Sequence, residues 1–218
     1  MKKYLVTALF LLILLTTINS QQNFVISKFN LKTIIIENNL LLKDKDIKGL
    51  LLPIYNKNLI FLDNLEVKKV LMQNSFIESF NVKKKYPSTL KIKIFEKKPI
   101  AVLFSKKNKF YLSEKMDLFE FKNLPNYQTL PYVFGNKDDF KIFYKNLKKI
   151  DFPLNIIAKY TLYETNRWDL KTKNNQVIKL PSKNYTKSLE SYLKLKNKNG
   201  FEKYELFDYR INNQLILK

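Results

Sequence analysis

The stretch from Val82 to Val102 constrains the fold most strongly, because it combines a periodic strand with a proline-marked boundary. In its centre, apolar residues alternate with lysine and phenylalanine. This period of two predicts a strand over residues 89–95 that has one buried face and one largely basic face. The buried face would carry Leu90, Ile92 and Ile94.

Prolines mark both ends of this strand. Pro87 fixes its own φ and pushes Tyr86 toward extended backbone, which gives the strand a defined start. After the strand come Glu96, two lysines and Pro99, and a second apolar run begins at Ile100. We therefore place a domain boundary between residues 96 and 99.

Upstream of the boundary, residues 25–96 predict a small α+β domain in the order strand, helix, helix, strand, strand. A β-branched run favours the first strand, Pro53 stops the first helix, and Asp63 with Glu66 resembles a capping box at the start of the second helix. A domain of this size is only marginally stable alone. The expected elements are a strand at 32–37, helices from Asp44 and Asp63, and strands at 76–83 and 89–95.

Downstream of the boundary, residues 97–218 change to a mainly β pattern. A mostly antiparallel β domain with flanking helices is therefore expected. Helices are expected at 138–150, where Asp138 and Asp139 would cap the first turn, and at 185–195. Strands are expected at 100–104, 110–112, 130–135, 205–210 and 214–218, with two more over 160–181 that turn at Asn174-Asn175.

The N-terminal segment has two interpretations. Its apolar stretch, Tyr4–Ile18, would form a helix of about 23 Å, shorter than the ~30 Å hydrocarbon core of a bilayer. In the first interpretation residues 4–20 are a retained membrane anchor and residues 1–3 a cytoplasmic stub, held inside by two lysines. In the second they are a cleaved signal peptide, with Ser20 before the cut, although Ile18 is larger than the residue preferred there. Both place the rest of the chain outside the cytoplasm.

The residue inventory excludes several kinds of chemistry. The chain has no cysteine and no histidine, so disulfides, thiolate catalysis, the usual zinc sites and most serine or cysteine triads are absent. Three glycines leave no phosphate-cradling loop. Helix capping accounts for Asp138-Asp139, the nearest approach to a paired-carboxylate site. We therefore expect no enzymatic activity, no cofactor and no metal.

The net charge of +21, from 40 basic and 19 acidic residues, favours anionic partners. The lysines are nevertheless spread along the chain, and no basic helix, zinc finger or glycine-rich RNA-binding motif accompanies them. Nucleic acid is therefore not an expected partner. An exported basic protein that binds anionic polymers remains an alternative, and its binding would weaken with added salt.

The motif order resembles that of a known family. Tyr86-Pro87-x-Thr-Leu90-x-Ile-x-Ile-x-Glu96-x-x-Pro99-Ile-Ala-Val resembles the end of the POTRA domain, and its junction with the β domain, in the bacterial division family FtsQ, called DivIB in Gram-positive bacteria. The chain departs from the family by a very short cytoplasmic tail, by Glu37-Asn38-Asn39 in place of a glycine, and by no variable tail after Lys218. Further motifs follow in the family's order: Leu130-Pro-x-x-x-Gly135, Arg167-Trp168-Asp169-Leu, Ile178-x-Leu-Pro181 and Phe207-Asp208-x-Arg210.

This resemblance implies a single-pass protein of the bacterial inner membrane, with a cytoplasmic N-terminus and periplasmic POTRA and β domains. It implies a non-catalytic divisome scaffold whose last strands recruit the small membrane proteins FtsB and FtsL during septum formation. Other divisome components would contact the POTRA domain. POTRA domains also chaperone outer-membrane proteins, but such chains repeat the module and continue into a barrel, and neither feature occurs here.

The candidate binding site is a terminal edge strand. An edge presents unpaired backbone groups to which a partner can add a strand, and the residues assigned to it are Ile211, Asn213, Leu215, Ile216 and Leu217. The alternative is that Leu215 and Leu217 only fill the core.

The charged motif residues have a structural and a ligand-binding interpretation. Trp168 is expected to be a core anchor, with Arg167 and Asp169 on the opposite face in cross-strand ion pairs, although the three could form a ligand cluster. Asp208 and Arg210 are expected to pair between adjacent strands and so to fix their register.

Overall fold

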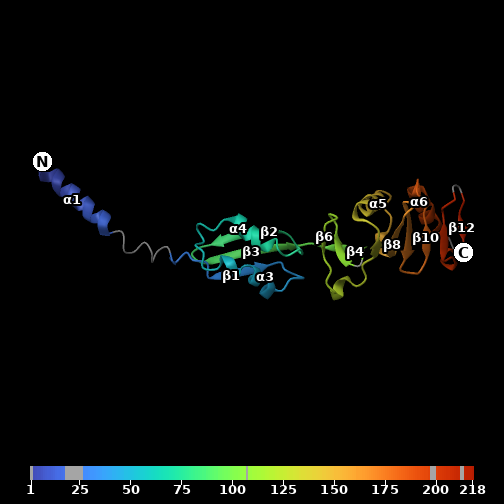
Figure 1. The fold of residues 1–218 in the computed structure, drawn as a ribbon, viewed down its shortest axis with the longest axis horizontal. Helices are drawn as coiled ribbons and strands as arrows, with labels where there is room; N and C mark the ends of the chain where they lie inside the picture. Colours follow the sequence, from blue (N-terminus) through green and yellow to red (C-terminus); the bar gives the residue numbers. More distant parts are fainter. Residues whose placement is uncertain (1, 18–26, 107, 197–199, 212–213) are drawn as a thin grey trace. The chain divides into compact units, whose positions relative to one another are not determined.

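The computed structural model describes residues 2–17, 27–106, 108–196, 200–211 and 214–218. The chain divides into two compact units, Met1–Lys97 and Lys98–Lys218 (Figure 1). The first contains a three-stranded sheet and the second a nine-stranded sheet. The α+β class predicted from the sequence is thus confirmed.

The N-terminal helix α1 runs over Lys2–Thr17, sixteen residues. Its apolar side chains are largely exposed, from Tyr4 at 81% to Leu15 at 67%. Within the described residues, no helix combines the length and the apolar character needed to cross a bilayer. Residues 18–20 of the helix expected at 4–20 lie outside the described residues.

The first unit has the predicted order of strand, helix, helix, strand, strand. Strand β3 (Thr89–Glu96) lies between β1 (Thr33–Glu37), which is parallel to it, and β2 (Ile77–Lys85), which is antiparallel. Helices α3 (Asp44–Leu50) and α4 (Asn64–Leu71) contribute buried Ile47, Val67 and Leu71 to the core, and the 3-10 helix η2 (Leu52–Ile54) follows α3. Leu90, Ile92 and Ile94 are fully buried, which confirms the alternating pattern.

The predicted capping box is only half formed. The Asp63 side chain caps α4 by accepting a hydrogen bond from the Leu65 N–H, 3.2 Å away. The carboxylate of Glu66 forms an ion pair with Lys57. A basic side chain nearby therefore engages the glutamate that the sequence pattern assigned to the cap.

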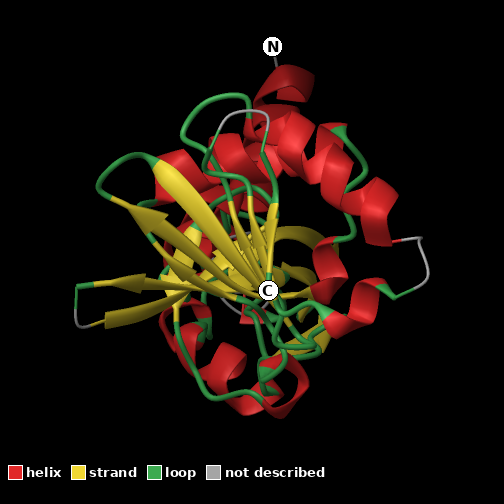
Figure 2. Cartoon of the chain, turned by 90° about the vertical axis from the view of Figure 1, so that its right-hand side faces the viewer, coloured by secondary structure: helices red, strands yellow, loops and turns green. Residues whose placement is uncertain are grey.

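The second unit is a mixed sheet in the order β12-β11-β10-β9-β8-β7-β4-β5-β6. Five of its pairings are antiparallel, whereas β11/β10, β8/β7 and β7/β4 are parallel. Figure 2 shows the strands fanning out, as expected from the twist of a sheet. The strands are β4 (Pro99–Ser105), β5 (Asn108–Ser113), β6 (Leu118–Glu120), β7 (Tyr132–Phe134), β8 (Ile157–Tyr163), β9 (Arg167–Thr172), β10 (Val177–Lys179), β11 (Leu206–Asp208) and β12 (Ile216–Leu217).

Helices α5 (Lys137–Lys149) and α6 (Tyr185–Lys196) cover one face of this sheet. Their buried residues, such as Phe143 and Tyr192, share one core cluster with the strands, and both helices lie on the same side of the sheet in Figure 1. Three short 3-10 helices, η3 (Pro125–Tyr127), η4 (Leu154–Ile156) and η5 (Phe201–Lys203), complete the unit.

Strand register creates two lateral rows of side chains. The inner row faces the helices, and the outer row lies one residue along each strand, on the opposite face. The inner row is Leu103, Val133, Tyr160, Leu170, Ile178, Phe207 and Leu217. The outer row is Phe104, Phe134, Thr161, Asp169, Lys179, Asp208 and Ile216.

Two local predictions for this unit are wrong. Three strands, β8 to β10, occupy the region expected to hold two, because Asn166 at φ 54° forms a turn in addition to the one at Asn175, at φ 65°. The cap of α5 is Asn136, whose side chain accepts from the Asp139 N–H at 2.8 Å. Asp138 and Asp139 therefore lie inside the first turn.

Candidate protein-binding site

Strand β12 forms one edge of the nine-stranded sheet. Lys218 and Leu206 exchange hydrogen bonds at 3.2 and 3.0 Å, while Leu217 lies opposite Phe207. Hydrogen-bonded and non-hydrogen-bonded pairs alternate along an antiparallel ladder, so the N–H and C=O of Leu217 point away from β11. The edge therefore offers a backbone donor and acceptor to an added strand.

The residues assigned to this edge divide into two groups. Ile211 and Ile216 are exposed, at 52% and 45%. Leu215 and Leu217 are half-buried and pack against the core. The strand covers only Ile216–Leu217, shorter than the stretch 211–217 expected, and Asn213 lies outside the described residues. Leu217 thus combines a core side chain with an outward-facing backbone.

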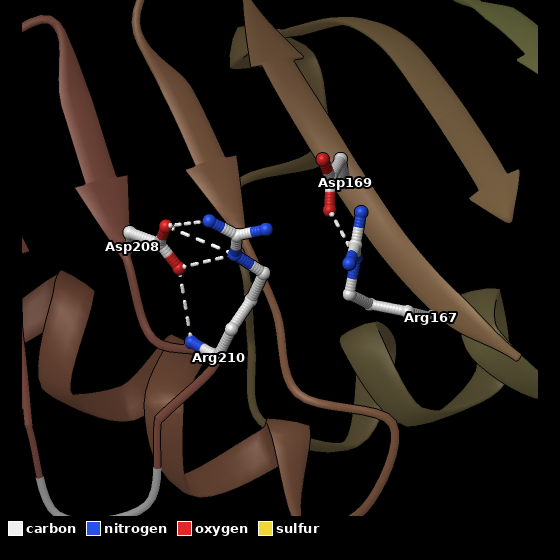
Figure 3. A network of polar contacts seen from close by, with 4 residues as sticks. All are labelled: Arg167, Asp169, Asp208 and Arg210. Carbon is white, nitrogen blue, oxygen red and sulfur yellow. Dashed lines mark hydrogen bonds and ion pairs between the residues drawn. The ribbon is translucent and has the colours of Figure 1, made fainter. Parts of the chain in front are cut away.

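A charged cluster lies beside this edge on the outer row, as Figure 3 shows. Arg167 Nε donates to Asp169 Oδ1 at 3.2 Å, and Arg210 donates to Asp208 through Nε and Nη2 at 2.6–2.9 Å. Both pairs join residues two apart in the sequence. The predicted cross-strand pairings are therefore wrong. Arg167 and Asp169 are two residues apart in β9 and so lie on the same face of that strand. Arg210 lies just after β11 and reaches back to Asp208, the last residue of that strand. The cross-strand neighbour of both aspartates is Lys179.

The pKa values of the two carboxylates in the cluster are shifted in opposite directions. Hydrogen bonds from Arg210 lower the pKa of Asp208, outweighing burial. Burial raises the pKa of Asp169, although Arg167 and Lys179 oppose it. Both carboxylate side chains are less than 10% exposed, whereas the Arg210 side chain is 44% exposed. The cluster thus presents basic groups outward over nearly buried acids.

Trp168 is a core residue, as predicted. It is 5% exposed and stacks on Phe143 of α5, with ring centroids 4.8 Å apart. Gly135 packs against the same place: a Cβ there would lie 2.9 Å from Leu162 Cβ and 3.2 Å from Trp168 Cη2. The Leu130-to-Gly135 and Arg167-Trp168 motifs therefore meet in one packing contact.

Glu96, the last residue of β3, holds the loop of residues 40–42 in place. The Glu96 carboxylate accepts hydrogen bonds from the backbone N–H groups of residues 40–42 at 2.8–3.2 Å. Asn38 adopts φ 64° and donates its side-chain amide to the Ile94 carbonyl at 2.7 Å. These contacts of Glu96 and Asn38 were not predicted from the sequence, although the tolerance of asparagine for positive φ is a signal for the turn at Asn38.

The remaining motif residues have structural positions. The Tyr86-Pro87 peptide bond is cis and lies between β2 and β3, while buried Pro99 begins β4. Pro181 follows Leu180, whose N–H donates to the Trp168 carbonyl at 3.1 Å. The described residues include no group of three or more acidic side chains that could hold a metal ion.

Two family models match the chain. The model described as "POTRA domain, FtsQ-type" matches residues 29–97, and that described as "Cell division protein FtsQ/DivIB, C-terminal" matches residues 101–210, about half of the chain.

Relatives named "Cell division protein FtsQ" support the same assignment. That of Rickettsia bellii is 27% identical over 194 residues, which cover 87% of this chain and 72% of the relative. Those of Rickettsia conorii and Rickettsia felis are each 27% identical over 157 residues, 70% of this chain but only 58% of the relative. The chain belongs to the FtsQ/DivIB family of cell division proteins.

Proposed function

We propose that this chain is a non-catalytic scaffold of the divisome, and that it recruits small membrane proteins of the FtsB and FtsL type by adding a partner strand to β12. The observation that carries the proposal is the outward-facing N–H and C=O of Leu217 at the sheet edge. Backbone hydrogen bonds would supply affinity, and side chains such as Ile216 would supply selectivity. A contact through one short strand buries little area, so a modest affinity is expected from it alone.

The test is a pull-down of the full chain in neutral detergent against the FtsB and FtsL of its host. Leu217→Pro removes the outward N–H and leaves the hydrogen bonds of Lys218 to β11 in place, as proline is tolerated where an edge N–H faces solvent. Leu217→Val keeps that N–H and is the matched control. We expect the valine variant to bind and the proline variant to fail.

Folding must be checked in both variants by the fluorescence of Trp168, the single tryptophan. A folded proline variant that still binds would refute strand addition. Binding by neither the wild type nor the control would instead favour an exported protein that binds anionic polymers, and its retention on a polyanion would then fall steeply with salt.

We also propose that α1 holds the chain at the inner membrane, with Lys2 and Lys3 on the cytoplasmic side. Its exposed apolar side chains support this, and a helix somewhat shorter than the hydrocarbon core is accommodated by local thinning and by snorkelling of flanking lysines. The chain should stay with membranes after an alkaline wash and keep Met1 by mass spectrometry. Release with a new N-terminus would instead support a cleaved signal peptide.

We further propose that the two units fold as separate domains, with the boundary at residues 96–99, and that the POTRA domain contacts other divisome components. The division of contacts between Lys97 and Lys98 supports the boundary. Unfolding monitored by Trp168 should then not coincide with unfolding monitored by far-ultraviolet circular dichroism, which reports both units. Coincident transitions would argue for one cooperative unit.

A further inference from the structure

A cleft of about 560 Å³ lies between the N-terminal part of α6 and four described residues around β12, namely Tyr209, Ile211, Gln214 and Leu215. Its lining is mainly polar and comes from two directions. Helix α6 contributes Lys187, Ser188 and Ser191, which share one side of the helix at spacings of three and four residues. Lys183 precedes the helix, and Tyr209 and Gln214 face it from the other direction.

Tyr209 is the unusual member of this lining. It is 7% exposed, and its hydroxyl has no partner of hydrogen-bonding geometry among the described residues. Burial raises the pKa of Tyr209, although the Ser191 side chain, acting as a donor toward the tyrosine oxygen, lowers it. The Tyr209 hydroxyl therefore stays protonated at neutral pH and still has its own proton to donate. Buried polar groups in folded proteins nearly always have a partner, so this one calls for an acceptor from outside the chain.

The charge of the cleft specifies the kind of acceptor. Lys183 and Lys187 bring two positive charges to the N-terminal end of α6, whose dipole is also positive there. None of the described lining residues is acidic, and the first turn of α6 has no acidic residue. The two lysines and the helix dipole together make this end of α6 attractive to an anion.

We propose that this cleft binds a phosphate group. Two ammonium groups, three hydroxyls and the side-chain amides of Asn184 and Gln214 offer more donors than the roughly four acceptor sites of one carboxylate. The three terminal oxygens of a phosphate monoester, or the four oxygens of the free ion, match them better. The phosphate is that of a free ion or of a monoester lipid such as phosphatidic acid, and the acyl chains of such a lipid would meet Ile211 and Leu215 at the same cleft. The proposal does not depend on strand addition at β12.

The test measures the melting temperature of the full chain in neutral detergent, monitored by Trp168 fluorescence, as inorganic phosphate replaces chloride at constant ionic strength. Ligand that binds the folded state alone raises the melting temperature in a saturable way. We expect such a rise for the wild type. In Tyr209→Phe and in Lys187→Gln, the phosphate concentration for half-saturation should increase at least about tenfold, as for a lost hydrogen bond to a charged group.

Matched variants separate the cleft from general effects. Tyr160 has the second buried hydroxyl without a partner in the described residues, and it does not line the cleft. Tyr160→Phe should therefore keep the wild-type response to phosphate, as should Lys145→Gln, which removes an exposed lysine of α5. Without phosphate, both phenylalanine variants should be at least as stable as the wild type, because each removes a buried unpaired hydroxyl.

Dihexanoyl phosphatidic acid, below its micellar concentration, distinguishes the two sources. Half-saturation at a lower concentration than for inorganic phosphate identifies a lipid headgroup, and equal values identify the free ion. The proposal is overturned if phosphate does not stabilise the wild type. It is equally overturned if the response of the Tyr209 and Lys187 variants matches that of the controls, since the ion would then bind the basic surface at large.

Discussion

Replacing Gly135 by alanine should destabilise the C-terminal unit by a steric effect alone. The new Cβ would lie 2.9 Å from Leu162 Cβ and 3.2 Å from Trp168 Cη2, whereas carbon atoms in contact are normally about 3.5–4.0 Å apart. Leu162 Cβ is fixed by its own backbone and cannot rotate away. Strands β7 and β8 must therefore shift, and overpacking of this kind costs roughly 1–3 kcal/mol.

Backbone conformation does not contribute to this cost. Gly200 has the only positive φ among the described glycines, so alanine is conformationally allowed at Gly135. Such a replacement would otherwise stabilise by about 0.4–1 kcal/mol through the unfolded state. Urea unfolding followed by Trp168 fluorescence measures the net effect. Gly49 in α3 is the matched control, because nothing lies within 4 Å of its added Cβ and Gly49→Ala should stabilise by about 0.5–1 kcal/mol. Gly49 lies in the first unit, so its effect is followed by far-ultraviolet circular dichroism.

A double-mutant cycle tests the assigned contact. Leu162→Gly removes the clashing Cβ, so Gly135→Ala should cost less in that background, whereas Leu162→Ala keeps the Cβ and should give less relief. The reasoning is refuted if Gly135→Ala is neutral. It is also refuted if its cost is the same in the Leu162→Gly background, because contacting residues are expected to couple by about 0.5 kcal/mol or more.

Three further changes probe the loop, the charged face and a helix cap. Glu96→Gln should lose roughly 1–3 kcal/mol of stability and speed amide exchange at residues 40–42, because it removes a charged acceptor of their N–H groups. Arg210→Gln should raise the pKa of Asp208 toward 3.8. A carboxyl group whose pKa is lowered by folding stabilises the protein at pH values above its unfolded pKa, and this stabilisation is lost as the pH falls through the folded pKa. The Arg210 variant should therefore be less stable than the wild type near neutrality. In acid titrations, the difference in stability should disappear below about pH 4. Asn136→Ala should cost about 1 kcal/mol in urea unfolding.

Each of these changes has a matched variant. Glu78→Gln alters an equally half-buried acid on β2 and should leave the exchange of residues 40–42 unchanged. Arg167→Gln removes the partner of Asp169 and should shift the Asp208 titration much less. Asp138→Ala changes the first turn of α5 without removing its cap. Equal effects in a pair would contradict the assigned contact.

Local sequence patterns located most helices and strands, but they could not predict which distant segments pair with one another. The alternation at Leu90, Ile92 and Ile94 located β3, because period-two burial needs no knowledge of the partner strand. Alternation along a strand gave the wrong partners for Arg167 and Arg210, because an ion pair between strands depends on how those strands are aligned, and only the folded sheet defines that alignment. The contact of Glu96 with residues 40–42 joins positions more than fifty apart, which no local signal carries.

The candidate edge shows the same division between local and distant information. Its position near the C-terminus, after Asn212-Asn213, was visible in the sequence, whereas the identity of its neighbour was not. Strand β11 lies parallel to β10 and antiparallel to β12, and this mixed arrangement makes β12 the edge. Parallel pairing depends on the crossover through α6, so the sequence alone could not rank the last strands across the sheet.

The two lateral rows limit which strand can be added at β12. The inner row ends at Leu217 and the outer row at Ile216, so an added strand extends both. On its inner face it meets the apolar layer under α6, and on its outer face it continues a row that contains Asp169, Lys179 and Asp208. A one-residue slip would exchange these faces and bury polar groups in the apolar layer. If a partner strand is added as proposed, side chains on both faces would therefore set its register, although β12 itself supplies only a short ladder of backbone hydrogen bonds.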